Sequence, residues 1–405
     1  MIVLAVGNVR LVLENYARYG VLVRLSAFDI RRRDVCLAAL LTALIPAHLF
    51  IAYVIESAAS LQIMAQARGE RRPPRKQLWS MIKLLHSVNA GFCLTFATVV
   101  VYYCIHQPLI GTFCEIHAVV VCLKTASYAL TNRDLRDGVL HSKPGPRLYA
   151  PAAYPHNLTL SNLSYFWWAP TLVYQPVYPR SPAFRPVFFV KRLLEIVGLS
   201  VLIWLLSAQY AVPILDHSLV HFHAMDVAGI VERLFKLASV SMVIWLAGFF
   251  LFFQSALNAL AEVMRFGDRQ FYDDWWNATS VGAYWKLWNK PVTNYFRRHI
   301  YVPLVRRGWN ATAASVMVFF VSGVLHELCV GVPTHNIIGA AFASMILQIP
   351  LVLATAPLER LKERMPAAGV FGNCVFWASF FLGQPLGALL YFFAWNVKQG
   401  HVPPA

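Results

Sequence analysis

The stretch SGVLHELCVGVP, residues 322–333, places a histidine and a glutamate side by side within a long apolar run. A charged side chain at bilayer depth costs at least about 2.5 to 3.5 kcal/mol on insertion scales, so such residues persist where they face a bundle interior or a wet cavity. A histidine ordinarily titrates near neutrality, which suits a general base that removes a proton from a hydroxyl group. The stretch therefore predicts a polar site at membrane depth.

On a helix the two ionisable side chains point in different directions. His326 shares its face with Ser322, whereas Glu327 is turned by about 100° and lies on the face of Gly323 and Gly331. Small residues four apart let a neighbouring helix approach closely, and a buried acid on that face needs a hydrogen-bond partner. We interpret Glu327 as a helix-contact residue. From the residues alone, His326 is either a structural hydrogen-bonding group or a functional base.

Cys329 lies one turn from His326 and suggests a second chemistry. A thiol beside a histidine can attack a thioester and form an acyl-enzyme intermediate. A cysteine in apolar surroundings, however, usually behaves as an inert core residue. The cysteine–histidine pair is therefore the poorer interpretation of Cys329.

The segment that precedes this apolar run is rich in aromatic and charged side chains. It contains FYDDWWN, residues 271–277, followed by GAYWKLWNKPV, residues 282–292. Alternating aromatic and charged residues are typical of segments that lie along a membrane interface. Clustered Trp and Arg also suit an adenine ring and phosphates, because aromatic faces stack on bases and guanidinium groups bind phosphate.

The composition of the chain identifies the class of protein that must position these residues. The 405 residues are 58% hydrophobic and 13% charged, and their mean hydropathy is +0.53. These values are typical of a polytopic membrane protein. Eight runs are apolar enough to cross a hydrocarbon core of about 30 Å: roughly 37–56, 88–106, 109–131, 188–212, 236–261, 313–332, 337–356 and 371–396.

A ninth span is expected at the start of the chain, over residues 1–23, where charges interrupt an apolar segment. With nine spans, the basic loops 57–87, 132–187, 262–312 and 357–370 share one side of the membrane. The positive-inside rule places them in the cytosol. An eight-span chain is the alternative, which the triple arginine Arg31–Arg33 favours.

The formal charge of +16 fits contact with anionic lipid or an anionic substrate, and nucleic acid is the poorer interpretation. The seven cysteines show no CxxC pair, so neither a disulfide framework nor a zinc site is predicted.

Several quoted segments together resemble one enzyme family. FYDDWWN matches the FYxDWWN signature of the membrane-bound O-acyltransferases, and HEL in the later apolar run resembles that family's intramembrane histidine. NVRLVLENYARYG, YPHNLTLSNLSYFWWAPTLVYQPVYPRSP, LWNKPV, RHIYVPLVRRG, LQIPLV and FGNCVFWASFFLGQPLGALLY resemble its type 1 diacylglycerol acyltransferase branch. The matching segments are spread over nearly the whole chain.

The resemblance implies an all-α polytopic protein with about nine transmembrane helices around an internal reaction chamber. It implies one integral-membrane domain over residues 1–405, with cytosolic loops at about 132–187 and 262–312 and a first span truncated at its N-terminus. The family further implies the membrane of the endoplasmic reticulum and a homo-dimer or homo-tetramer.

The resemblance also assigns roles to residues. His326 would be the base, with Asn289 as a second catalytic group. Gln348, Gln384, Glu327 and Trp288 would contact the substrates, and the acyl-CoA loop would comprise Phe271, Tyr272, Asp274, Trp275, Trp276 and Asn277. The implied reaction transfers a fatty acyl group from acyl-CoA to the free hydroxyl of diacylglycerol, giving triacylglycerol and CoA.

No metal or other cofactor is expected for this reaction, because the thioester is already activated. Each glutamine also has a structural interpretation, since both stand close before a proline and an amide can satisfy backbone groups that proline leaves free. A sterol, a fatty alcohol or a monoacylglycerol is the alternative acceptor. A proton-relaying transporter would more often show internal repeats, which the sequence lacks.

Overall fold

The computed structural model describes residues 30–67, 76–141 and 147–398, together with residues 17 and 400. These residues form helices, and the one sheet-like pairing among them is an isolated antiparallel bridge between Arg180 and Phe266. A helix satisfies every backbone N–H and C=O within its own segment, as an apolar run in a bilayer requires. The predicted all-α class is confirmed.

Seven helices in the described part of the chain are long and apolar enough to cross a membrane. They correspond to seven of the eight apolar runs predicted from the sequence, so a multi-pass membrane protein is confirmed. These helices are Arg32–Met64, Gln77–Cys104, Pro108–Leu140, Val227–Val263, Ala311–Gly331, Ala340–Leu361 and Pro366–Lys398.

The predicted count of nine spans is not confirmed. The remaining apolar run, 188–212, is helical but is not among the seven. The expected span at residues 1–23 falls outside the described residues, apart from the single residue 17.

The first group of helices packs around small and branched apolar side chains. Ala97 and Ala118 are fully buried at the contact between α4 and α5, and Leu41 and Ile45 pack against the same core. Small residues allow these helices to approach closely. The group comprises α2 (Arg32–Leu44), α3 (Ala47–Ala67), α4 (Lys76–Cys104) and α5 (Pro108–Leu140).

The helix α5 is longer than expected, because residues 132–140 of the predicted loop 132–187 continue it. Two polar side chains in this extension are buried and bonded. Asn132 Nδ2 donates to Tyr128 O at 3.0 Å, and Arg136 Nη1 lies 2.5 Å from Glu56 Oε1 in α3. Internal partners therefore keep this polar segment helical where composition predicted a loop.

A long helical hairpin follows. Its first arm consists of α7 (Pro186–Leu206), a short π-helical segment η3 (Ser207–Ala211) and α8 (Val212–His223). Its second arm consists of α9 (Val227–Phe249), a second π-helical segment η4 (Phe250–Ala256) and α10 (Leu257–Val263). Before it, η2 (Arg147–Ala152) and α6 (Leu160–Trp168) run beside α3 and α5. Buried Lys124 of α5 donates to three carbonyl oxygens at the end of α6.

Short helices fill the second predicted loop, 262–312. They are η5 (Trp275–Asn277), α11 (Val281–Leu287), α12 (Lys290–Phe296), η6 (Arg297–Tyr301) and α13 (Val302–Arg306). The chain ends with α14 (Ala311–Gly331), α15 (Ala340–Ile346), α16 (Gln348–Leu361) and α17 (Pro366–Lys398).

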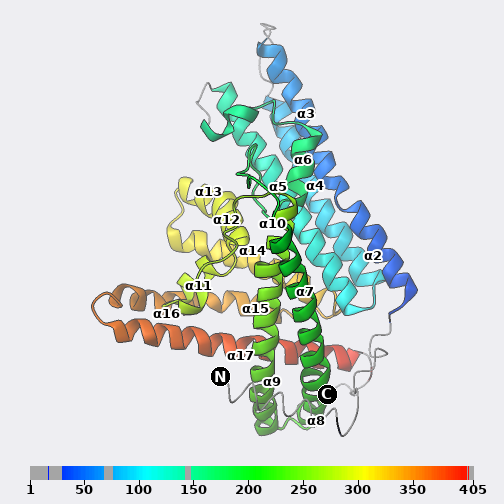
Figure 1. Ribbon diagram of the computed structural model, residues 1–405, viewed down its shortest axis with the longest axis vertical. Helices are drawn as coiled ribbons and strands as arrows, with labels where there is room; N and C mark the ends of the chain where they lie inside the picture. Colours follow the sequence, from blue (N-terminus) through cyan, green and yellow to red (C-terminus); the bar gives the residue numbers. More distant parts are fainter. Residues whose placement is uncertain (1–16, 18–29, 68–75, 142–146, 399, 401–405) are drawn as a thin grey trace.

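Figure 1 shows three groups of helices that meet at the short helices. The slanting group α2 to α5 lies to one side, the green hairpin of α7 to α9 runs along the long axis, and α17 crosses the hairpin with α16 packed along it. The largest buried cluster lies where these groups converge, and it includes Tyr128 of α5, Phe249 of α9, Trp275 of η5 and Phe376 of α17. The aromatic segment predicted from sequence thus supplies part of the core.

Candidate active site

His326 lies in the second half of α14 with one ring nitrogen already engaged. Its Nδ1 is 2.7 Å from the backbone oxygen of Ser322, one turn earlier. A carbonyl oxygen can only accept, so Nδ1 donates the hydrogen and the neutral ring carries its free lone pair on Nε2. The side chain is exposed. The geometry therefore presents Nε2 as an accessible proton acceptor.

Glu327 is buried on a different face of the helix, as expected for a helix-contact residue. Its Oε1 accepts from Gly339 N at 2.9 Å, while its Oε2 accepts from Phe342 N at 3.1 Å and from Tyr391 Oη at 2.7 Å. Both oxygens thus have protein partners, in α17 and at the start of α15. The carboxylate joins three helices instead of offering a free acceptor to a substrate.

The small residues beside Glu327 are needed for this contact. A Cβ at Gly331 would lie 2.8 Å from Glu327 Oε1 and 3.0 Å from Asn336 O. A Cβ at Gly323 would lie 2.9 Å from the ring of Phe342. The chain therefore approaches both glycines closely: Gly323 faces Phe342 of α15, and Gly331 faces the connection that leads into α15.

Asn289 stands at the start of α12 and caps it. Its Oδ1 accepts from Val292 N at 3.2 Å, an ordinary N-cap bond that leaves the amide nitrogen available. Trp288, immediately before it, stacks on Tyr284 with ring centroids 5.9 Å apart and an interplanar angle of 14°. Both predicted residues are half-buried, at the edge of the aromatic core.

Gln348 is linked to the helix of His326 through a tryptophan that the sequence did not single out. Trp285 Nε1 donates to Gln348 Oε1 at 3.3 Å, and the Trp285 ring meets Phe319 edge to face at 5.6 Å. Phe319 and His326 are seven residues apart, which is two turns and about 10 Å along one helix face. Gln384, the other predicted glutamine, is half-buried in α17.

The FYDDWWN segment divides into buried and exposed side chains. Phe271 and Trp275 are 2% and 1% exposed and belong to the main core. Asp274, Trp276 and Asn277 are exposed. The buried pair can act as scaffold, while the exposed three are accessible to a ligand. The contact of this segment with acyl-CoA stays a prediction.

Backbone and side-chain bonds fix this segment in place. Asp273 N donates to Leu287 O at 2.9 Å and Lys290 N donates to Phe271 O at 3.0 Å, which ties the segment to α11 and α12. The Lys290 ammonium also pairs with the Asp273 carboxylate. Tyr272 Oη donates to Gln254 Oε1 at 2.8 Å in η4, so the segment is anchored on two sides.

Sequence reasoning missed a second set of anchors around an acid at the end of α10. Glu262 is fully buried, and its carboxylate accepts from Arg185 N at 2.6 Å, from Arg185 Nη2 at 2.8 Å and from Arg269 Nη1 at 2.5 Å. These bonds join the start of α7 to the segment that leads into FYDDWWN. An acid at the end of an apolar run was the available signal, but its partners are distant in sequence.

His299 in η6 is a half-buried ionisable group near α14. Its Nε2 lies 2.7 Å from Ser127 Oγ of α5, and Tyr174 N donates to the same oxygen at 2.9 Å. Burial, reinforced by the neighbouring Arg298 charge, lowers the pKa of His299 to about 4. The ring is therefore neutral at physiological pH.

Comparison with known proteins gives a consistent result. Residues 76–393 match the model of the membrane-bound O-acyltransferase family. Diacylglycerol O-acyltransferase 1C of Glycine max is 34% identical over 99% of this chain and 75% of the relative. Diacylglycerol O-acyltransferase 1 of Bos taurus is 35% identical, and that of Homo sapiens 34%, each over 100% of this chain and 81% of the relative. The chain therefore belongs to the membrane-bound O-acyltransferase family, as its sequence motifs indicated.

Proposed function

We propose that the chain transfers a fatty acyl group from acyl-CoA to the free hydroxyl of diacylglycerol, releasing triacylglycerol and CoA. The single observation that carries the proposal is His326, whose Nδ1 is held by Ser322 O while its Nε2 stays accessible. The curated relatives named diacylglycerol O-acyltransferase 1 support this choice of acceptor.

In the proposed reaction, His326 Nε2 accepts the hydroxyl proton as the oxygen attacks the thioester carbonyl carbon. The new ester C–O bond forms, the C–S bond breaks, and the sulfur leaves as the CoA thiolate, which takes up a proton. This direct transfer requires no acyl-enzyme, so Cys329 takes no part in the proposed reaction. A positioned base of this kind contributes about two to four powers of ten in rate.

The negative charge that develops on the carbonyl oxygen needs hydrogen-bond donors. Asn289 Nδ2 is a candidate, because its Oδ1 is committed to the cap of α12 and thereby orients the amide. Gln348 and Gln384 are the other amides that we assign to the substrates. One such donor contributes about 2.7 to 4 kcal/mol to transition-state stabilisation. The thioester is already activated, so we propose acyl-CoA as a co-substrate and no separate cofactor.

We assign the exposed Asp274, Trp276 and Asn277 to the acyl-CoA side of the site, with Phe271, Tyr272 and Trp275 holding their segment in place. We further propose that the protein works in the membrane of the endoplasmic reticulum as a homo-dimer or homo-tetramer. Family membership supports both statements, and the long basic loops support a cytosolic position for the acyl-CoA side.

The test is an assay of microsomes with labelled oleoyl-CoA and a panel of acceptors. His326→Ala should lower triacylglycerol synthesis by about two to four powers of ten at equal expression, since the base is lost. His217→Ala is the matched control, because His217 Nδ1 makes the same local bond to a backbone oxygen, Pro213 O at 2.7 Å, in α8.

Two results would contradict the proposal. If His326→Ala synthesised triacylglycerol at the wild-type rate, His326 would not be the base. If the unmodified protein preferred a sterol, a fatty alcohol or a monoacylglycerol, the proposed acyl transfer would stand but the acceptor would not be diacylglycerol.

A further inference from the structure

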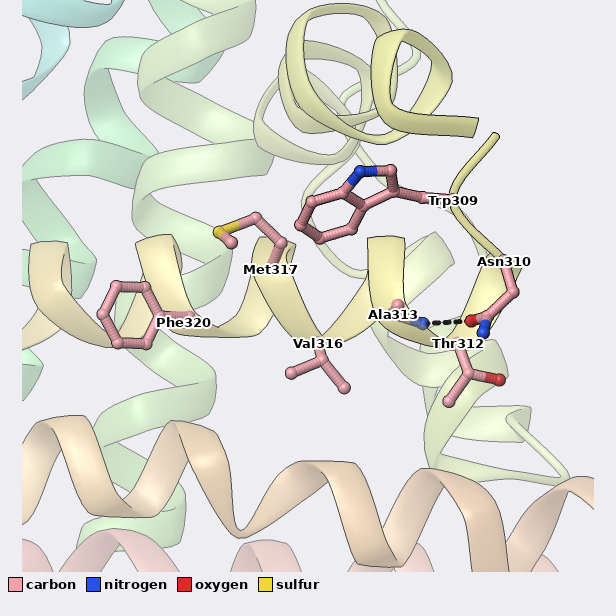
Figure 2. A pocket seen from close by; sticks show the side chains of 7 residues that line it. All are labelled: Trp309, Asn310, Thr312, Ala313, Val316, Met317 and Phe320. Carbon is pink, nitrogen blue, oxygen red and sulfur yellow. Dashed lines mark hydrogen bonds between the residues drawn. The ribbon is translucent and has the colours of Figure 1, made fainter. Parts of the chain in front are cut away.

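The first half of α14 borders a groove that the proposed reaction does not use. Figure 2 shows it between Trp309, just before the helix, and Phe320, with Ala313, Val316 and Met317 along its wall. Its volume is about 450 Å³, within the range of sites that hold small ligands, and its lining is almost entirely apolar.

The groove has the length of a lipid chain within one leaflet. Trp309 and Phe320 are eleven residues apart, which corresponds to about 16 Å along the helix. This is close to half of the hydrocarbon core of about 30 Å. Phe320 meets Phe342 edge to face at 5.6 Å, and this aromatic pair stands at the apolar end.

The side chains along the groove are accessible to lipid. Trp309 is 42% exposed, Val316 39% and Phe320 47%. Such a row at bilayer depth is suited to van der Waals contact with an acyl chain, and the polar lining side chains, Asn310 and Thr312, lie toward the Trp309 end of the groove.

Two arginines precede Trp309, which lines the other end of the groove, by three and two residues. Arg306 and Arg307 are exposed at the end of α13, and the turn that follows is held by the bond from Trp309 N to Leu304 O at 3.2 Å. The Asn310 Oδ1 accepts from Ala313 N at 2.7 Å (Figure 2), which leaves the neutral amide nitrogen as a donor beside the two charged arginines. The two guanidinium groups are therefore the groups suited to bind an anionic headgroup, and guanidinium binds phosphate well.

We propose that this groove binds one acyl chain of an anionic membrane phospholipid, whose phosphate pairs with Arg306 and Arg307. The basic loops assign this end of α14 to the cytoplasmic leaflet, which carries the anionic lipids. A tryptophan at the start of the helix is also typical of the headgroup level. This binding is separate from acyl transfer and does not depend on it.

The test is photo-crosslinking of the purified full chain in phosphatidylcholine vesicles. Two probes with the same diazirine-bearing acyl chain are compared, each added in trace amount: an anionic phosphatidylglycerol and a zwitterionic phosphatidylcholine. Mass spectrometry measures the adducts that each probe forms on residues 309–320. We expect at least about fivefold more adduct with the anionic probe, and a ratio near one in the double variant Arg306→Gln/Arg307→Gln. The matched control, Arg360→Gln/Arg364→Gln, removes the same charge at the end of α16 and should keep the wild-type ratio.

Val316→Trp fills the groove and should lower the adducts of both probes. Equal adducts for the two probes in the wild-type chain, or an equal loss of selectivity in the control variant, would overturn the proposal. So would displacement of the anionic probe by excess CoA, which would assign the arginines to the phosphates of the co-substrate. Unchanged adducts in Val316→Trp would place the chain outside the groove. None of these readouts depends on acyltransferase activity.

Discussion

The two halves of α14 have opposite surroundings. In residues 321–331 the polar and small residues Ser322, Gly323, Glu327 and Gly331 are buried, and Glu327 is bonded to groups of α15 and α17. In residues 311–320 Ala314 is the only buried residue. A carboxylate is thus kept at membrane depth where neighbouring helices supply N–H and O–H donors. The half that borders the lipid-sized groove carries apolar side chains.

Removal of the Glu327 carboxylate is expected to have the largest effect on stability among the changes that test this difference. Glu327→Ala would leave Gly339 N, Phe342 N and Tyr391 Oη without their acceptor in a buried contact. Each unsatisfied buried group costs about 1 to 3 kcal/mol, so we expect a loss of at least about 3 kcal/mol. Thermal unfolding in detergent, followed by size-exclusion chromatography, measures this loss.

The conservative variant Glu327→Gln supplies the control. Its amide keeps one carbonyl acceptor, so the loss should be smaller than for alanine. If Glu327→Ala unfolded at the wild-type temperature, the carboxylate would not hold α14, α15 and α17 together.

Acid should affect the contact between α14 and η6, because η6 carries His299 and packs against that helix. His299 takes up a proton in the unfolded chain below about pH 6.5, whereas its pKa is about 4 in the folded chain. The unfolded state therefore binds more protons between these values, and stability falls as the pH is lowered through this window. The maximum loss is about 3 kcal/mol, and it ends near pH 4, where both states are protonated.

Thermal unfolding of the wild type and His299→Gln between pH 7 and pH 4 tests this assignment. The variant should lose less stability over the window, because its side chain does not titrate. Parallel curves for the two proteins would show that other groups cause the acid sensitivity.

The smallest effect is expected where α14 borders lipid. Val316→Ala removes two methyl groups from a side chain that is 39% exposed, and lipid can fill the space. A change within about 0.5 kcal/mol is expected, as for surface positions in general. Gly331→Ala, in the other half of the helix, is the matched comparison and should destabilise the protein by about 1 to 3 kcal/mol, since its Cβ would meet Glu327 Oε1 at 2.8 Å. Equal unfolding temperatures for the two variants would remove the distinction between the halves.

Much of the fold was predictable from the sequence, because long apolar runs can satisfy their backbone in a bilayer only as helices. Helical periodicity also separated His326 from Glu327 and placed Glu327 with the two glycines. The length of α5 was not predictable, since its polar end is buried by the partner Glu56, about 80 positions away. The link from Gln348 through Trp285 to Phe319 was likewise hidden, because it joins three distant segments.

The sequence by itself determined the membrane class, the family and the identity of the intramembrane histidine, since these depend on composition, local periodicity and short motifs. Only the tertiary structure decided which donors satisfy Glu327 and which residues of FYDDWWN are buried. Each of these depends on hydrogen bonds or packing between groups whose distance in space is not encoded in their spacing along the chain. A pattern along one helix indicates which face needs a partner, and the fold supplies that partner.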